Sequence, residues 1–334
     1  MKHAAAQADR VVVEAGLSHH IDQIHRQQTA QGRAGCLLVC GEPGMGKTRL
    51  LHGLARQAGA AAGCVRELRC FPEFVQSPFQ PVLVMLEDLF GFQPGDNPAQ
   101  RFERLRHHCE TLDTRTRPAQ AVPLLAQLLS LPLGHGYAAP RSSPQRQKEQ
   151  TVELLLQLLA GPADGQPRLL IIEDLHWMDP SSLELLVKLA DRARLQDAQP
   201  LLAVFSCRPE FVAPWPAGRV ERLELLPLAQ AEARHMVLAI APDTTADLAQ
   251  RIVERCDGVP LFIEEMSRLA AVGKLASIPP TLHDLLAERI DRLGEARYTA
   301  QLATAQRAGN KRRVAAIHAK IANTRRDHLH KVST

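Results

Sequence analysis

The stretch that decides the fold is Cys36-Leu37-Leu38-Val39-Cys40-Gly41-Glu42-Pro43-Gly44-Met45-Gly46-Lys47-Thr48. Its first five residues form a short apolar run, which is typical of a buried strand. The glycines that follow let backbone N–H groups converge on an anion, and a helix beginning near Lys47 adds the positive end of its dipole. This order of strand, glycine-rich loop and helix predicts a phosphate-binding loop, or P-loop.

The loop residues have distinct expected roles. Lys47 is expected to reach the β- and γ-phosphates of ATP, and the Thr48 hydroxyl to coordinate Mg2+. An accidental glycine-rich turn is the alternative, but four fixed positions match by chance in only about one chain in a hundred of this length. The predicted ligands are therefore ATP and Mg2+. The residues predicted to bind the nucleotide are Gly41, Glu42, Pro43, Gly44, Met45, Gly46, Lys47 and Thr48.

A second apolar run, residues 169–172, ends in two acids, Glu173 and Asp174. In P-loop ATPases a neighbouring strand presents an acid to the magnesium shell, and a second acid can orient the attacking water. An ordinary strand end is the alternative, but the preceding phosphate loop favours a catalytic pair. Position suggests Glu173 for Mg2+ and Asp174 for water, whereas the usual order is Asp then Glu. The prediction is therefore the pair, as catalytic residues and, with Thr48, as metal ligands.

Short apolar runs alternate with helical patterns, which predicts an α/β P-loop NTPase fold with a parallel sheet and crossover helices. The expected strands are residues 36–40, 65–70, 169–172, 201–206 and 220–225. The expected helices around them are residues 49–58, 82–89, 148–159 and 181–195. Residues 91–147, rich in Pro, Gly and polar side chains, predict an insertion around a helix near 119–131.

After residue 225 the pattern becomes wholly helical, which predicts a small all-helical domain followed by a basic helical tail. The helices expected there are residues 228–238, 245–255, 261–271 and 282–293. The predicted division is an N-terminal segment at 1–30, a P-loop ATPase domain at 31–215, a helical lid or regulatory domain at 216–293 and a basic tail at 294–334.

Composition excludes several classes of protein. The 334 residues are 45% hydrophobic and 23% charged, and no apolar run approaches the roughly 18 residues of a membrane span. The N-terminus lacks the apolar core of a signal peptide. Seven scattered cysteines without a Cys-x-x-Cys pair argue against a disulfide framework or a zinc site, and those beside apolar runs are expected to be small core residues. We expect a cytoplasmic, reduced protein without a membrane partner.

Positive charge is concentrated at the end of the chain. Residues 305–334 hold eight basic groups against one acid. Val314, Ile317 and Ile321 fall on one face of a predicted basic helix. Such a helix could contact nucleic-acid phosphates, although a solvated tail is the plainer interpretation. Nucleic acid is thus expected as a partner only through this tail.

With both motifs placed, residues 30–293 resemble the signal-transduction ATPases with numerous domains. These are AAA+-like modules of class III cyclase-associated proteins and large LuxR-type regulators. The resemblance implies that Arg208 senses the γ-phosphate and that Pro260 lies against adenine. A surface arginine before the turn-forming Pro209, and a helix stop at Gly258, are the plainer alternatives. The resemblance is carried by the loop at 41–48, Glu-Asp-Leu-His-Trp-Met-Asp-Pro-Ser-Ser-Leu-Glu at 173–184, Ser-Cys-Arg-Pro-Glu at 206–210, Cys-Asp-Gly-Val-Pro-Leu-Phe-Ile-Glu-Glu at 256–265 and Ile-Pro-Pro-Thr-Leu at 278–282.

Several features depart from that family. The Gly-Arg pair that usually precedes the P-loop strand and helps to hold the base is missing from residues 11–20. His176 and Trp177 are expected to pack behind the acidic motif rather than to touch nucleotide. Residues 307–334 resemble part of an RNA-guided nuclease-type transposase of insertion sequences, but without catalytic acids or a zinc ribbon. Neither a nuclease nor a cyclase domain is expected in this chain.

The expected function is an ATP-binding, slowly hydrolysing switch ATPase module of a signalling or transcriptional regulator, truncated of its effector. Its partners would be ATP and a protein effector or a second copy of the chain. One alternative is a non-functional remnant of a gene interrupted by an insertion sequence. Another is an origin-recognition-like AAA+ ATPase that binds DNA.

Overall fold

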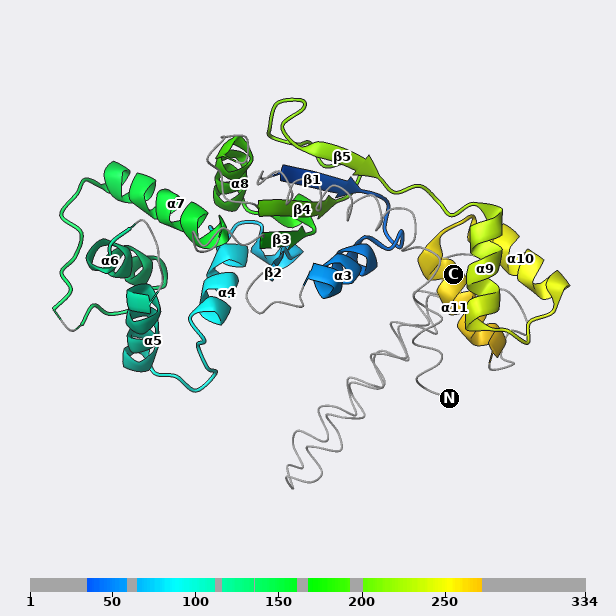
Figure 1. Ribbon diagram of the computed structural model, residues 1–334, viewed down its shortest axis with the longest axis horizontal. Helices are drawn as coiled ribbons and strands as arrows, with labels where there is room; N and C mark the ends of the chain where they lie inside the picture. The colour runs from blue at the N-terminus through cyan, green and yellow to red at the C-terminus, as the bar shows by residue number, and fades with distance from the viewer. Residues whose placement is uncertain are drawn as a thin grey trace, which may run out of the picture.

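The computed structural model describes residues 35–58, 65–111, 116–134, 136–160, 168–192 and 201–271. The expectations for residues 1–30, 278–293 and the basic tail lie outside these ranges. At the centre of the described part is a five-stranded, wholly parallel sheet with the order β2-β3-β4-β1-β5 (Figure 1). The strands are β1 Gly35–Cys40, β2 Val65–Arg69, β3 Arg168–Glu173, β4 Leu201–Cys207 and β5 Glu221–Glu224. The predicted α/β fold with a parallel sheet is confirmed.

The three central strands read as nearly continuous apolar runs because both of their faces are covered. Every residue of β3 and β4 is buried, and so are the last five residues of β1. The edge strands β2 and β5 are more polar and more exposed. β5 pairs with β1, so the sheet extends beyond the predicted boundary at residue 215.

Helices cover both faces of the sheet. On one face, α3 (Lys47–Ala58) packs Leu50, Leu51 and Leu54 against alternate residues of the strands. The other face is covered by α4 (Gln80–Leu89), α7 (Pro144–Ala160) and α8 (Pro180–Arg192), whose buried leucines join the largest core cluster (Figure 1). Consecutive residues of each strand therefore serve two different cores, as the pleat requires.

The predicted insertion is helical. Besides α6 (Pro118–Leu128), expected near 119–131, it contains α5 (Pro98–Thr111), which was not predicted. α5 is strongly polar and buries only Phe102, Leu105 and Cys109, so its apolar stripe is thin. Short 3-10 helices at Pro72–Phe74 (η1) and Leu175–Trp177 (η2) follow β2 and β3.

Beyond β5 the described chain is helical, as predicted. Helices α9 (Gln230–Ile240), α10 (Ala246–Cys256) and α11 (Pro260–Ala271) pack around a core of their own, which includes Val237, Ile252 and Ile263. Figure 1 shows this bundle at the opposite end of the molecule from α5 and α6, with the sheet between them. Within the described ranges, every helix is too short or too polar to cross a membrane.

Candidate functional site

The P-loop occupies the carboxyl end of β1, between strands β4 and β5. β1 ends at Cys40 and α3 begins at Lys47, so the predicted loop joins them directly. Gly44 and Gly46 have φ angles of 84° and 85°. Side chains are disfavoured in this left-handed region, so the turn of the loop depends on glycine at these two positions.

The Lys47 side chain lies inside the loop. Its residue is only 9% exposed, and Nζ donates hydrogen bonds to the carbonyl oxygens of Gly41 (2.6 Å) and Glu42 (3.0 Å). Burial lowers the pKa of Lys47, while the nearby Asp174 carboxylate acts in the opposite direction by favouring the charged form. The loop therefore holds a cation against two carbonyl oxygens, where phosphate oxygens would compete for its protons.

Glu173 ends β3 and points toward α3. Its Oε1 lies 3.5 Å from Nε2 of His52 on α3, one turn after Thr48. Glu173 is buried, and its Oε2 has no hydrogen-bond partner among the described residues. A buried carboxylate oxygen without a partner costs free energy, and a bound cation would remove that cost.

Asp174 follows immediately but lies in a different environment. Its backbone is left-handed (φ 60°, ψ 48°), and its N–H donates to Oγ of the buried Ser206 on β4 at 3.0 Å. Its carboxylate is 4.0 Å from the guanidinium of Arg69. A non-glycine residue at positive φ is uncommon and is held here by its surroundings. Ser206, which the sequence analysis named in the 206–210 motif without giving it a role, therefore helps to place the second acid.

Arg208 directly follows β4, one strand away from both acidic residues and the P-loop. Its Cζ lies 5.7 Å from the centre of the Trp177 ring, and its Nη1 is 3.9 Å from the Glu210 carboxylate. The charge of Arg208 also contributes to the lowered pKa of Lys47. Because β4 lies between β3 and β1, the sheet order brings Arg208 to the same edge as Lys47 and Asp174.

The two aromatic residues after the acidic pair lie in η2. Trp177 packs against the main core and holds Arg208 over its ring, so it contacts a predicted site residue through a cation–π interaction. His176 contacts Trp177, with ring centres 4.9 Å apart and the ring planes tilted by 48°. Both ring nitrogens of His176 are buried without hydrogen-bond partners among the described residues, and burial lowers its pKa.

Asp179 fixes the segment behind the acidic motif. It caps the N-terminus of α8, where its Oδ1 accepts a hydrogen bond from Ser182 N at 2.9 Å. The same oxygen accepts from Phe79 N at 3.0 Å, which ties the loop after β2 to the loop after β3. An acid followed by proline is a recognisable helix start, so the cap could have been found in the sequence, but the bond to Phe79 could not.

The helical bundle contacts the phosphate loop directly at the start of α11. Leu261 N donates to the Gly44 carbonyl oxygen at 3.1 Å. A Cβ added at Gly44 would lie only 3.2 Å from Val259 Cγ1, so the two segments are closely packed. Glu264 lies 3.8 Å from Arg49 of α3. Pro260, the first residue of α11, is thus beside the P-loop, and Val259 and Leu261 are contacts that the sequence did not predict.

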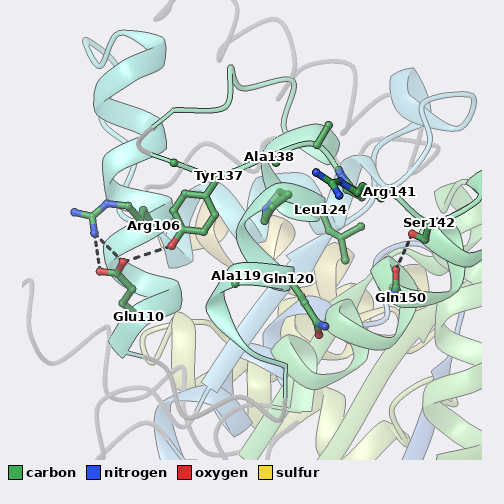
Figure 2. Close-up of a pocket in the computed structure, with 14 residues that line it drawn as sticks. Arg106, Glu110, Ala119, Gln120, Leu124, Tyr137, Ala138, Arg141, Ser142 and Gln150 are labelled. Atoms are coloured by element: carbon green, nitrogen blue, oxygen red, sulfur yellow. Dashed lines mark hydrogen bonds and ion pairs between the residues drawn. The ribbon is translucent and has the colours of Figure 1, made fainter.

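An open cavity of about 930 Å3 lies elsewhere, in the insertion (Figure 2). Figure 2 shows the Arg106–Glu110 ion pair and Tyr137 on one side, and the hydrogen bond between Ser142 and Gln150 on the other. None of the residues predicted to bind nucleotide lines this cavity. The phosphate site is therefore defined by the loop and the strand ends, and not by this cavity.

A parallel strand leads through a glycine-rich loop with a buried lysine into a helix, and the acidic end of β3 lies at the same edge of the sheet. β3 is not the neighbour of the P-loop strand, as the sequence suggested, because β4 lies between them. This arrangement defines a P-loop NTPase. Residues 15–204 match the family described as AAA ATPase domain, and the chain belongs to that family. Membership of this family supports nucleotide binding.

The chain is also similar to individual proteins. An uncharacterized protein of Rhizobium meliloti (strain 1021) is 28% identical over 298 residues, which is 81% of this chain; the chain spans only 27% of that relative. A signal transduction ATPase with numerous domains and a tetratricopeptide repeat sensor, from Pyrococcus horikoshii, has a TM-score of 0.43 at 14% identity, over 84% of this chain and 34% of its own. A structure of the Drosophila origin recognition complex bound to DNA has a TM-score of 0.45 at 16% identity. The match covers 96% of this chain and 77% of that one.

Proposed function

We propose that this chain is a switch-type ATPase module of a signalling or transcriptional regulator, of the kind found in signal-transduction ATPases with numerous domains. It would bind ATP with Mg2+ and hydrolyse it slowly. The observation that carries the proposal is the hydrogen bond from Leu261 N to the Gly44 carbonyl oxygen. Because the helical bundle is joined to the loop that would hold the phosphates, a nucleotide can bias the position of the bundle.

The chain supplies its own groups for phosphate binding. Backbone N–H groups of the loop and the N-terminus of α3 would bind the phosphate oxygens. Lys47, now bonded to Gly41 O and Glu42 O, would transfer its hydrogen bonds to the β- and γ-phosphates. The exchange replaces two neutral acceptors by charged ones, which strengthens each bond.

The site also fits a magnesium ion. The unpartnered Oε2 of Glu173 and the Thr48 hydroxyl are oxygen donors of the type that Mg2+ takes in nucleotide sites. Bound Mg2+ neutralises charge on the β- and γ-phosphates. Since His52 contacts the other oxygen of Glu173, we assign Glu173 to the metal site and Asp174 to holding the attacking water.

Two further assignments follow from the resemblance to the family. Arg208 would sense the γ-phosphate, and the Trp177 ring would hold its guanidinium while no phosphate is present. Pro260 would lie against the adenine. The contacts of α11 with the P-loop support a place for Pro260 beside the nucleotide.

The experiment that tests binding is titration calorimetry with ATP and Mg2+ on the wild type and on Lys47→Ala. Losing a charge-assisted interaction costs about 1.5–3 kcal/mol, so Lys47→Ala should weaken binding by roughly 10- to 160-fold. Lys188→Ala, which removes an exposed lysine of α8, is the matched control and should bind like the wild type. Equal affinities for Lys47→Ala and the wild type, or no binding by the folded wild type, would refute the proposal.

Hydrolysis is tested separately with Asp174→Asn. This variant should bind ATP with nearly wild-type affinity but lose turnover, because an amide cannot accept the proton of the attacking water. Measurable wild-type turnover that is abolished by Lys47→Ala would also reject the alternative of a non-functional remnant. The DNA-binding alternative and the transposase resemblance depend on residues outside the described ranges and stay predictions.

A further inference from the structure

Two cysteines face each other at the carboxyl end of the sheet. Cys40 is the last residue of β1 and Cys207 the last of β4, and the two are register partners in the parallel pair. Their sulfur atoms lie 3.0 Å apart. The next residues along the chain are Gly41 of the P-loop and Arg208, so the pair joins the two segments that carry the proposed site.

The arrangement suits a disulfide bond. Adjacent strands are about 4.8 Å apart, and bridged cysteines commonly have their Cα atoms about 4.4–6.8 Å apart. Because register partners on a parallel pair point to the same side, the two side chains need no change of face. Both belong to the core cluster between the sheet and helices α4, α7 and α8. The bond could thus form with little movement of the strands.

The pKa of Cys40 differs from that of the other described cysteines, including Cys207, whose pKa is raised chiefly by the same hydrogen bond with Cys40. The pKa of Cys40 is lowered to about 7, chiefly by its hydrogen bond with the Cys207 thiol, while burial opposes the shift. Burial raises the pKa of Cys36, Cys70 and Cys256 to about 12. A thiolate, rather than a thiol, attacks an oxidant, so Cys40 is the favoured nucleophile among these.

Access to the pair runs through the edge of the sheet. Cys40 and Cys207 are 1% and 0% exposed, so an oxidant reaches them only after a local opening. β5 is an edge strand of four residues, and its Glu224 is the register partner of Cys40. Short edge strands open at a small fraction of the cost of global unfolding, and hydrogen peroxide is small and uncharged.

We propose that Cys40 and Cys207 are a site of oxidation, in which hydrogen peroxide converts the two buried thiols into a disulfide that joins β1 to β4. The Cys40 thiolate attacks a peroxide oxygen; an S–O bond forms, the O–O bond breaks, and hydroxide leaves as water with one proton. The Cys207 sulfur then attacks the Cys40 sulfenic acid; the S–S bond forms, the S–O bond breaks and a second water leaves. Two thiols are oxidised by two electrons and one peroxide is reduced to two waters.

The test uses the full chain, treated with a small excess of hydrogen peroxide, alkylated, and digested with trypsin without reduction. Cys40 lies in peptide 34–47 and Cys207 in peptide 195–219, since cleavage is poor before Pro209. We expect these peptides to appear as a linked pair that dithiothreitol separates. Wild-type protein with peroxide-oxidised thiols but without this linked pair would overturn the proposal.

Peptide 34–47 also contains Cys36, which provides a matched control. Cys36 pairs with Ala203, four positions from Cys207 and about 13 Å along the strand, so it cannot reach Cys207. Cys36→Ser should keep the linked pair, whereas Cys40→Ser and Cys207→Ser should lose it. A link that persists in Cys40→Ser would assign it to Cys36 and refute the inference. If a variant fails to fold, fragmentation of the linked wild-type peptides decides between Cys40 and Cys36 as the residue bonded to Cys207, and a bond at Cys36 would refute the inference.

Discussion

Replacing Gly258 by alanine should strongly destabilise the connection between the sheet and the helical bundle. Gly258 has a φ of +72°, and its carbonyl oxygen accepts a hydrogen bond from Leu228 N at 2.8 Å. An added Cβ would lie 2.6 Å from Leu228 O, 3.0 Å from Leu228 N and 2.9 Å from Pro227 Cβ. Two of these three atoms belong to the backbone, so the clash cannot be relieved by a side-chain rotation.

Three contributions give the magnitude. A side chain in the left-handed region costs about 1–2 kcal/mol, of which about 0.4–1 kcal/mol is returned by the stiffer unfolded chain. Overpacking adds about 1–3 kcal/mol. Loss of the bond between Leu228 N and Gly258 O adds about 0.5–1.5 kcal/mol. Gly258→Ala should therefore lower the free energy of unfolding by about 4 kcal/mol.

Gly91→Ala separates the backbone cost from the steric cost. Gly91 also has a positive φ, +67°, but a Cβ there meets nothing within 4 Å. The Gly91→Ala variant should therefore lose only about 0.5–1 kcal/mol of unfolding free energy. Urea unfolding of both variants, followed by circular dichroism, measures the difference. If Gly258→Ala is no less stable than Gly91→Ala, the contact between Gly258 and Leu228 does not constrain the bundle.

Two further predictions concern stability. Asp179→Ala removes the cap of α8 and the acceptor of Phe79 N, so urea unfolding should show a loss of about 2–4 kcal/mol; a loss below about 0.5 kcal/mol would mean that the two loops are held together by other contacts. Burial lowers the pKa of His108 below its usual 6.5, so the unfolded chain binds the proton more readily and stability should fall as pH drops below 6.5. His108→Phe keeps the aromatic contact with Phe90 and should lose less stability between pH 7 and about pH 5 than the wild type; identical pH profiles would contradict this assignment.

The P-loop could be predicted from the sequence because its signals are local. An apolar run, two glycines that adopt positive φ and a lysine at a helix start lie within 13 consecutive residues. The acidic strand end at Glu173 was predictable for the same reason. The helix α5 could not be predicted, because its few apolar residues form only a narrow apolar face in a segment rich in Arg, His and Gln.

The different environments of Glu173 and Asp174 needed the structure. The sequence suggests only from position that Glu173 binds Mg2+ and Asp174 holds water, against the usual order of Asp then Glu. The pleat turns Glu173 toward α3 and His52, while the left-handed backbone of Asp174 is held by Ser206 of the next strand. Ser206 is a common residue in an apolar run, and nothing local distinguishes it from an ordinary strand residue.

The sequence by itself therefore determined the parallel α/β class, the phosphate loop and the helical character of residues 226–271, since each depends on patterns within a few consecutive residues. Only the tertiary structure decided which distant residues meet. The sheet order places β4 between β3 and β1, which brings Arg208 to the edge with Lys47 and puts the sulfur of Cys207 against that of Cys40. The packing of α11 on Gly44 likewise could not be predicted from either segment of the sequence alone. Such contacts arise from how strands and helices bury their shared apolar faces, and not from any one segment.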